Sequence, residues 1–236
     1  MSLLAIIQAR MNSRRLPGKS MLPLAGIPLI EHVVRRVQAT TMPMDVIVAT
    51  SESTSDDPLA AHVESLGVRV YRGSEEDVLA RFYWAAENFP EAEAIVRVTA
   101  DDPFLDPELI DAVTGLFLAE WASPRIPSRE PPDLMGIGMG PSWPQGLNVE
   151  VFTRAALTDA FKLASAPEDR EHVTKWMAEH CQCWFARNHF NIGGQHLKWD
   201  IDDPHDYAFA LRVYNDLYPT NPLFGFRAMI AAGYGG

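Results

Sequence analysis

Short apolar runs alternate with amphipathic segments in the first part of the chain, and this order constrains the fold most strongly. Short apolar runs are typical of buried strands, and apolar residues three or four apart are typical of helices. The expected strands are residues 3–7, 46–50, 68–71 and 94–99, and the expected helices are 29–38, 58–66 and 75–88. This alternation predicts a three-layer, Rossmann-like α/β fold: a mostly parallel sheet with helices on both faces.

The rest of the chain continues the pattern less regularly. We expect strands at 147–151 and from 197 onward, and helices at 153–164, 167–180 and 205–218. We expect Ser74, Thr153 and Asp203 or Asp202 to cap helices. Residues 122–146 are rich in Pro and Gly, and a long loop inside a compact domain indicates an arm or lid. A chain of 236 residues is then one domain, residues 1–236.

A basic loop follows the first expected strand. It carries Arg10, Arg14, Arg15 and Lys19 among the turn formers Asn12, Ser13, Pro17 and Gly18. Open α/β sheets bind ligands just beyond the carboxyl ends of their strands. Several fixed cations and free backbone amides at that place favour a polyphosphate.

The end of this loop imitates a different phosphate-binding motif. Gly18, Lys19 and Ser20 match the last three positions of a Walker A loop. That motif also requires a glycine five residues before Gly18, and position 13 is Ser13. A P-loop nucleoside triphosphatase is therefore excluded.

Two acidic turns follow later strands. Asp101 and Asp102 come just after strand 94–99, and Asp200, Asp202 and Asp203 lie at the end of the last expected strand. Mg²⁺ is commonly held by one or two carboxylates together with substrate phosphates. Asp101 and Asp202 are the expected pair, with Asp200 as the alternative. The structural alternatives are that Asp101 and Asp102 only form a turn before Pro103 and that Asp202 only caps a helix.

Composition limits the partners. The net charge of −11 argues against nucleic acid as a ligand, and no membrane-spanning or secretory segment is visible. Cys181 and Cys183 are the only cysteines, and residues one apart on a strand point to opposite faces and do not pair. We expect reduced thiols, no zinc site and a cytoplasmic location.

Several motifs resemble the sugar cytidylyltransferases, the group that includes the Kdo and acylneuraminate cytidylyltransferases and the spore-coat polysaccharide biosynthesis proteins. The basic loop reads Ala9-Arg10-x-x-Ser13-x-Arg15-Leu16-Pro17-Gly18-Lys19, which is similar to the loop that wraps CTP in that group. Residues 146–152, GLNVEVF, and 169–174, DREHVT, are similar to runs in the spore-coat relatives, with Asn148 in place of their Asp. The resemblance implies a nucleotidyltransferase fold, CTP and a small sugar acceptor as substrates, Mg²⁺, and a homodimer.

The resemblance also implies roles for individual residues. Arg15, Lys19 and Asp101 are the expected catalytic residues, and Asp101 and Asp202 the metal ligands. Thr99 stands where the Kdo enzymes have a Gln associated with the base, and Ala100 where the family has Gly. The expected nucleotide-binding residues are Ala9, Arg10, Asn12, Ser13, Gly18, Lys19, Ser51, Ser74 and Thr99. The expected acceptor-binding residues are Asn148, Glu150, Arg170 and His172.

Two other classes of function stay open from the sequence. Asp200-x-Asp202 imitates the metal-binding motif of glycosyltransferases, although a nucleotide-sugar donor carries only two phosphates. A non-catalytic nucleotide-binding module would bind CTP without turnover. The released product distinguishes the three, because only nucleotidyl transfer gives pyrophosphate.

Overall fold

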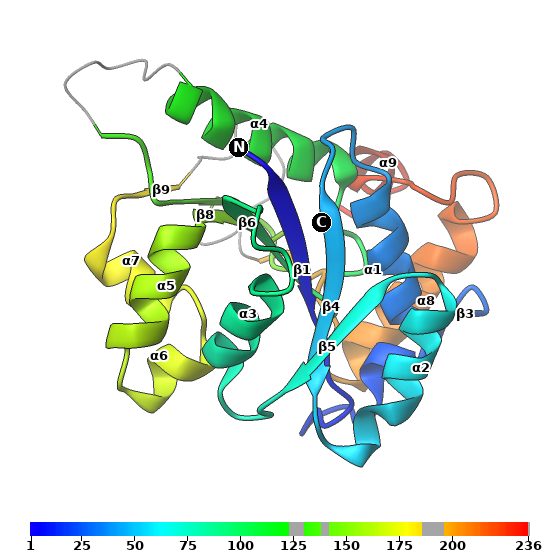
Figure 1. Cartoon of the computed structure of the whole chain (residues 1–236). Helices are drawn as coiled ribbons and strands as arrows, with labels where there is room; N and C mark the ends of the chain where they lie inside the picture. Colours follow the sequence, from blue (N-terminus) through cyan, green and yellow to red (C-terminus); the bar gives the residue numbers. More distant parts are fainter. Residues whose placement is uncertain (123–129, 138–141, 186–195, 236) are drawn as a thin grey trace.

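The structure is a computed structural model that describes residues 1–122, 130–137, 142–185 and 196–235. In the described residues, the strands form a seven-stranded sheet in the order β5-β4-β1-β6-β8-β7-β9 (Figure 1). The strands are β1 Leu3–Gln8, β4 Asp45–Ser51, β5 Arg69–Gly73, β6 Ala94–Thr99, β7 Leu134–Ile137, β8 Val149–Thr153 and β9 Cys183–Phe185. Strand β8 runs antiparallel to β6 and β7, and the other neighbours are parallel. The expected mostly parallel α/β sheet is confirmed.

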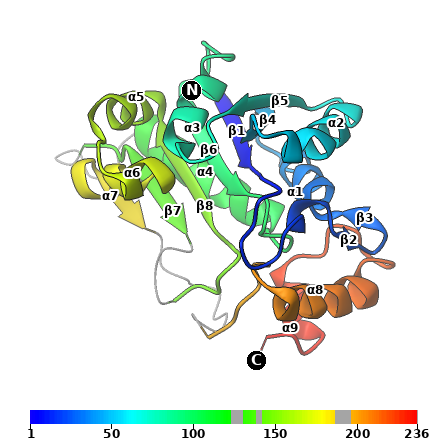
Figure 2. The same cartoon turned by 90° about the horizontal axis from the view of Figure 1, so that it is seen from below.

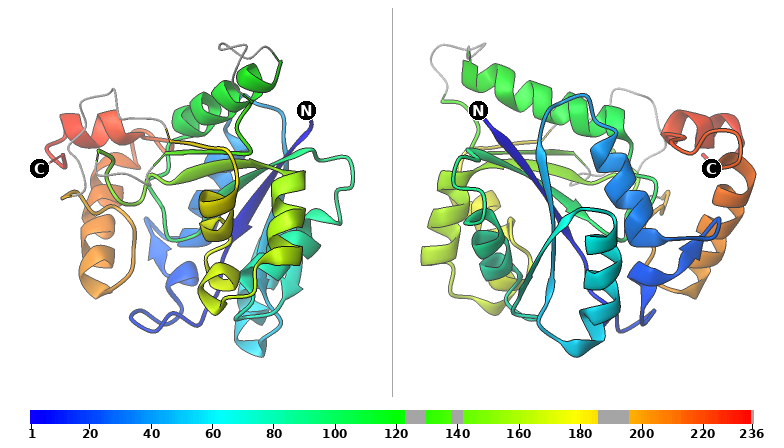
Figure 3. Two further views of the ribbon diagram at one scale, coloured as in Figure 1. Left: turned by 90° about the vertical axis from the view of Figure 1, so that its left-hand side faces the viewer. Right: turned by 45° about the vertical axis from the view of Figure 1, so that its right-hand side comes forward.

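Helices cover both faces of this sheet (Figure 3). The helices are α1 Leu29–Gln38, α2 Asp57–Ser65, α3 Val78–Ala86, α4 Pro107–Ala122, α5 Arg154–Leu163, α6 Pro167–Glu171, α7 Lys175–His180, α8 Pro204–Leu217 and α9 Phe226–Ala231. Apolar side chains of α3, α5 and α7 pack on one face of the sheet, and those of α1, α2, α4 and α8 pack on the other. A short hairpin, β2 Pro23–Leu24 and β3 Ile27–Pro28, precedes α1.

The alternating residues of the central strands explain the two cores. On β1, Leu4 and Ile6 face the core under α3, while Ala5 and Ile7 face the core under α1. Side chains of a strand alternate between faces, so a continuous apolar strand needs a helical layer on each side. Burial on both faces fixes β1 at the centre and places its carboxyl end, with the basic loop, at the edge shown in Figure 2.

Two expectations for the second half were wrong. Residues 167–180 form two short helices, α6 and α7, because the chain turns at Val173, whose φ of 40° is incompatible with a continuous helix. The stretch from 197 is not a strand; it makes a single bridge, between Gln145 and Lys198. The strand expected at 147–151 is present as β8, and all five residues of β8 are buried.

Helix caps were predicted with mixed success. Thr153 accepts from the amide of Ala156 and caps α5, and Asp203 caps α8, as expected. The cap of α3 is Asp77 rather than Ser74, and the Ser74 hydroxyl instead accepts from the amide of Asp77. The helix therefore begins three residues later than the sequence suggests. Residues 123–129 and 138–141 of the expected arm lie outside the described residues.

Candidate active site

A cavity of about 1000 Å³ opens at the carboxyl ends of β1 and β6. Most of the predicted nucleotide-binding residues line it. Its lining residues are Gln8, Ala9, Arg10, Asn12, Ser13, Arg14, Arg15, Lys19, Ser20, Ser74, Glu75, Glu76, Thr99, Ala100, Asp101, Pro167, Glu171 and Asp202. The basic loop and both acidic turns thus border one space, as the position of strand ends in an α/β sheet predicts.

The basic loop keeps its shape through hydrogen bonds to its own backbone. The carbonyl of Met11 accepts from the amides of Ser13, at 2.9 Å, and Gly18, at 2.8 Å. Gly18 has a φ of 76°, a left-handed conformation that glycine adopts without strain. The buried Ser20 hydroxyl donates to the carbonyl of Arg10 at 3.0 Å. These bonds hold the loop so that Arg10, Arg14 and Arg15 project from a closed turn.

Asp56 anchors the loop from behind, and the sequence analysis did not identify it. Its carboxylate accepts from the amide of Met11, the hydroxyl and amide of Ser51, and the hydroxyl of Thr50, at 2.6–2.9 Å. Burial alone would raise the pKa of Asp56, but these donors lower it below its usual value. Ser51 is fully buried and donates to Asp56, so it supports the loop and does not line the cavity as expected.

Lys19 contacts both acidic turns. Its ammonium group lies 2.7 Å from an Asp101 oxygen, 3.2 Å from an Asp202 oxygen and 2.7 Å from the Ile201 carbonyl. Arg15 pairs with the other Asp202 oxygen at 2.7 Å. The predicted catalytic residues and both predicted metal ligands are therefore joined in one cluster. Asp101 and Asp202 lie 82 and 183 residues from Lys19 in the sequence.

The charges of this cluster stabilise one another. Burial would lower the pKa of Lys19, but the charges and hydrogen bonds of Asp101 and Asp202 raise it above the usual value. Burial would raise the pKa of Asp202, but Lys19, Arg15 and Lys198 together lower it. Lys198 lies 3.8 Å from Asp202 and also pairs with Asp206. Lys19 and Asp202 are both charged at neutral pH.

Two further carboxyl groups beside the cluster, those of Asp102 and Asp200, have raised pKa values. Burial, with the neighbouring Asp101 charge, raises the pKa of Asp102 well above its usual value. Burial and the charges of Asp202 and Asp101 raise the pKa of Asp200 to about 6. Asp102 accepts from the Thr99 hydroxyl at 2.7 Å, whereas Asp200 Oδ1 is buried without a hydrogen bond. Asp102 and Asp200 therefore lie beside Asp101 and Asp202 in surroundings that disfavour the charged form of both groups.

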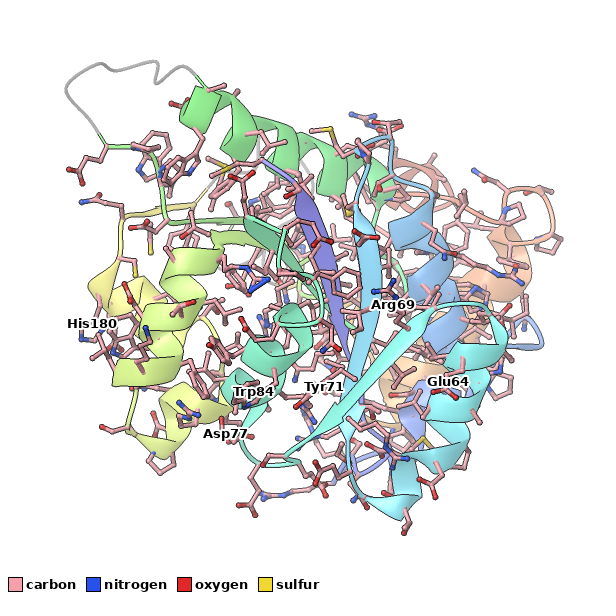
Figure 4. The ribbon with its side chains drawn as sticks, viewed as in Figure 1. Glu64, Arg69, Tyr71, Asp77, Trp84 and His180 are labelled. Atoms are coloured by element: carbon pink, nitrogen blue, oxygen red, sulfur yellow. The ribbon has the colours of Figure 1, made fainter. Side chains whose placement is uncertain are left out.

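The four predicted acceptor-binding residues do not line the cavity. Arg170 binds Asp77 at 2.6–3.0 Å and the carbonyl of Phe161, which ties α6 to the start of α3; Figure 4 labels Asp77. His172 is exposed where α6 ends. Their neighbours Pro167 and Glu171 line the cavity instead.

Glu150 lies within β8, and Asn148 lies just before this strand. Glu150 is buried and pairs with Arg97 of β6, and the amide oxygen of Asn148 is buried without a hydrogen bond. Arg97 was not singled out from the sequence. The one available signal was its position in an otherwise apolar strand, where a charge needs a partner.

Cys181 and Cys183 are both free, as expected. Burial and nearby carboxylates raise the pKa of each thiol to about 11. Both thiols are therefore protonated at neutral pH and poorly reactive.

Sheet order and cavity position are those of an α/β nucleotidyltransferase fold. The structure superposes on the cytidylyltransferase from Leptospira borgpetersenii with a TM-score of 0.87 and 26% identity, covering 98% of this chain and 93% of that chain. CMP:2-keto-3-deoxy-manno-octonic acid synthetase, solved in complex with CTP, shares the fold with a TM-score of 0.64 and 16% identity, covering 91% of this chain and 99% of that one.

Sequence similarity identifies the family. A family model described as Cytidylyltransferase matches residues 4–183. The spore coat polysaccharide biosynthesis protein SpsF of Bacillus subtilis is 34% identical over 90% of this chain and 86% of its own length. The 3-deoxy-manno-octulosonate cytidylyltransferase of Idiomarina loihiensis is 33% identical over 74% of this chain and 67% of its own length. The chain belongs to the cytidylyltransferase family.

The described residues contain no helix long and apolar enough to cross a membrane.

Proposed function

We propose that this protein transfers a cytidylyl group from CTP to a hydroxyl of a sugar acid or related sugar, with release of pyrophosphate, for polysaccharide biosynthesis. The observation that carries the proposal is the convergence of Lys19, Asp101 and Asp202 beside the basic loop. The substrates are suggested by relatives: CTP is bound in the structurally similar synthetase, and SpsF is named for spore-coat polysaccharide biosynthesis.

The triphosphate fits the basic loop because the cations there are available to it. Arg10 and Arg14 line the cavity, and neither makes an ion pair with the described residues. A bound triphosphate would take these two guanidinium groups together with exposed loop amides. Arg15 and Lys19 would then turn from the carboxylates toward the phosphates that leave.

The reaction needs little covalent work from the protein. The acceptor oxygen attacks the α-phosphorus, the bond from that phosphorus to the bridging oxygen breaks, and pyrophosphate leaves with the bond's electron pair. Lys19 and Arg15 stabilise the negative charge that grows on pyrophosphate. Asp101 lies at the same edge and is placed to receive the hydroxyl proton.

The carboxylates suit Mg²⁺ only together with the nucleotide. Among the described residues, no group of three or more His, Cys, Asp or Glu side chains is arranged to hold an ion. Asp101 and Asp202 nevertheless share one cation, the Lys19 ammonium, and Asp200 Oδ1 beside them accepts no hydrogen bond and lies 3.9 Å from the Lys198 ammonium. Mg²⁺ typically takes one or two carboxylates and completes its shell with phosphates and waters. Bound there by Asp101 and Asp202, it would neutralise phosphate charge.

A screen for pyrophosphate release tests the proposal. The four ribonucleoside triphosphates are each incubated with Mg²⁺ and a panel of sugar acids, amino sugars and polyols. Pyrophosphate formed with CTP and a sugar is the expected result. Free nucleoside diphosphate from a nucleotide sugar would instead indicate a glycosyltransferase, and CTP binding without product would indicate a regulatory module. The homodimer and the cytoplasmic location remain predictions.

A further inference from the structure

Helix α8 is attached to both acidic turns. It begins at Pro204, two residues after Asp202. Further along the same helix, the Tyr214 hydroxyl donates to the carbonyl of Pro103 at 2.6 Å, and Pro103 lies two residues after Asp101. The start of one helix therefore follows the turn of Asp202, while a side chain from its inner face holds the turn of Asp101.

The turn that carries Asp101 has weak backbone hydrogen bonds of its own. The amide of Asp102 donates to the carbonyl of Thr99 at 3.3 Å, and the amide of Leu105 donates to the carbonyl of Asp102 at 3.2 Å. Both distances are at or beyond the long end of the usual range for such bonds. Pro103 has no N–H group that could add another bond. The position of Asp101 therefore depends on contacts from elsewhere in the chain.

Two donors outside this turn make shorter contacts with it. The Ile201 amide donates to the Asp101 carbonyl at 2.8 Å, and the Tyr214 hydroxyl bond to Pro103 is 2.6 Å long. Ile201 directly precedes Asp202, and Tyr214 follows it on α8. The segment that carries Asp202 thus holds the Asp101 turn from both sides of Asp202.

Close packing fixes the ring of Tyr214. The side chain is fully buried, and its ring centroid lies 4.5 Å from that of His32, 5.6 Å from that of Phe104 and 5.1 Å from that of Phe224. Phe104 belongs to the Asp101 turn, so Tyr214 holds this turn by packing as well as by its hydrogen bond. A phenylalanine would fill almost the same space, and burying a hydroxyl costs free energy unless it is bonded. Packing alone therefore does not explain the hydroxyl.

We propose that Tyr214 is a positioning residue: its hydroxyl fixes the Asp101 turn on α8 and thereby sets the distance between the Asp101 and Asp202 carboxylates. The Lys19 ammonium contacts these carboxylates at 2.7 and 3.2 Å, so their separation decides whether one cation serves both. Misplacement by about 1 Å can slow a reaction about a hundredfold. The kinetic consequence rests on the proposed function, whereas the effect on Lys19 in the free protein does not.

Hydrogen exchange at the Lys19 ammonium tests this role in the free protein. The chain has four lysines, at positions 19, 162, 175 and 198, so NMR signals of isotope-labelled lysine ammonium groups can be assigned by substitution, with Lys19→Met for Lys19. We expect a protected Lys19 signal in wild type. Tyr214→Phe should speed hydrogen exchange at Lys19 by about tenfold, because the Asp101 turn opens more often. Exchange at Lys175, which pairs with Glu168, should be unchanged.

Steady-state kinetics give the second measurement. Tyr214→Phe should lower kcat for pyrophosphate release by about tenfold and change KM for CTP by less than about twofold, because the basic loop is untouched. Tyr218→Phe is the matched control, since it removes a hydroxyl at the end of α8 that accepts from Arg35 at 3.1 Å. It should change neither kcat nor exchange at Lys19.

A double variant shows whether Tyr214 acts through Asp101. In the Asp101→Asn background, Tyr214→Phe should add nothing to the exchange rate at Lys19, because the contact that it positions is already weakened. The melting temperature reports whether each variant keeps its fold. If Tyr214→Phe does not fold, Phe104→Leu replaces it; this change loosens the same turn from its own side and should speed exchange at Lys19 in the same direction.

Four results would overturn the positioning role. They are an unprotected Lys19 signal in wild type, wild-type exchange in the folded variants, an equal effect of Tyr218→Phe, and a change in KM for CTP in place of kcat. Pyrophosphate release together with exchange insensitive to Tyr214 refutes the positioning role and leaves cytidylyl transfer standing. Exchange that depends on Tyr214, without pyrophosphate release from any triphosphate, refutes the transfer and leaves the positioning of Asp101 standing.

Discussion

Two charged clusters of the molecule hold their partners in different ways. At the phosphate end, which comprises the basic loop with Asp101 and Asp202, Lys19 divides its bonds between two acidic turns, and Arg15 is 63% exposed. Within the sheet, Arg97 and Glu150 are neighbours by strand register and almost completely covered. Loop partners can be exchanged when a ligand arrives, whereas sheet partners cannot. We infer that the phosphate end rearranges and that the Arg97–Glu150 pair stays fixed.

The largest effect is expected from the carboxylates of the phosphate end. Asp101→Asn and Asp202→Asn should each lower kcat by about a thousandfold or more, because each removes charge that holds Mg²⁺ and orients Lys19. Steady-state pyrophosphate release measures this. Asp203→Asn is the matched control: Asp203 caps α8, and asparagine caps equally well. Activity that persists in excess chelator would remove the metal from the mechanism.

Loss of Lys19 should have two opposite effects. Lys19→Met should lower turnover by about a hundredfold, because it removes a charge-assisted contact to phosphate. It should also tighten Mn²⁺ binding in the absence of nucleotide, because the ammonium no longer occupies the place between Asp101 and Asp202. Electron paramagnetic resonance of free Mn²⁺ measures the second effect.

The control for Lys19→Met is Lys175→Met, a lysine paired with Glu168 on α6. It should change neither Mn²⁺ binding nor turnover. Mn²⁺ affinity in Lys19→Met no higher than in wild type would contradict an exchange of partners at the phosphate end.

Replacing Arg15 should lower activity less than replacing Lys19. Its side chain is largely exposed and meets only Asp202, and exposed ion pairs contribute little until a ligand excludes water. Arg15→Ala should lower kcat by about tenfold with a smaller change in KM for CTP, because its charge acts on the leaving pyrophosphate. Arg35→Ala, another half-exposed arginine with one carboxylate partner, should leave both unchanged. An effect larger than that of Lys19→Met would reverse the order that the geometry implies.

The smallest effect is expected in the choice of base. CTP should bind about tenfold more tightly than ATP or GTP, as the relatives suggest. Calorimetric titration of each triphosphate measures this preference. Equal or tighter binding of a purine triphosphate would show that Thr99, which stands where Kdo enzymes have Gln, belongs to a site with a different base preference.

The phosphate end was largely predictable from the sequence, and the Arg97–Glu150 pair was not. Arg10 and Asp101 follow the neighbouring strands β1 and β6, whose ends the topology brings together. Asp202 lies just before α8 on a segment that is not a strand, so its place beside Lys19 was implied by the resemblance and not by strand topology.

The sequence predicted a strand at 147–151 and, through the resemblance, an acceptor-binding role for Asn148 and Glu150, but it gave no sign of the partner of Glu150. Glu150 is buried because helices cover its face of the sheet and Arg97, far away in sequence, supplies the opposite charge.

The helix boundaries predicted for residues 167–180 were wrong for a related reason. Residues 167–180 have helical composition, but the chain turns at Val173, whose side chain is buried in the core under α5. Arg170 also ties α6 to Asp77 on α3. Tertiary contacts of this kind outweigh local propensity, and no local pattern records them.

The central claim is that the phosphate end catalyses nucleotidyl transfer to a sugar. Phosphorus NMR of a reaction with CTP, Mg²⁺ and the sugar panel, run with wild type and Asp101→Asn, tests it most directly. We predict that wild type forms pyrophosphate and a cytidine monophosphate sugar in equal amounts, and that Asp101→Asn forms neither. Formation of CDP, or equal product from both proteins, would contradict it.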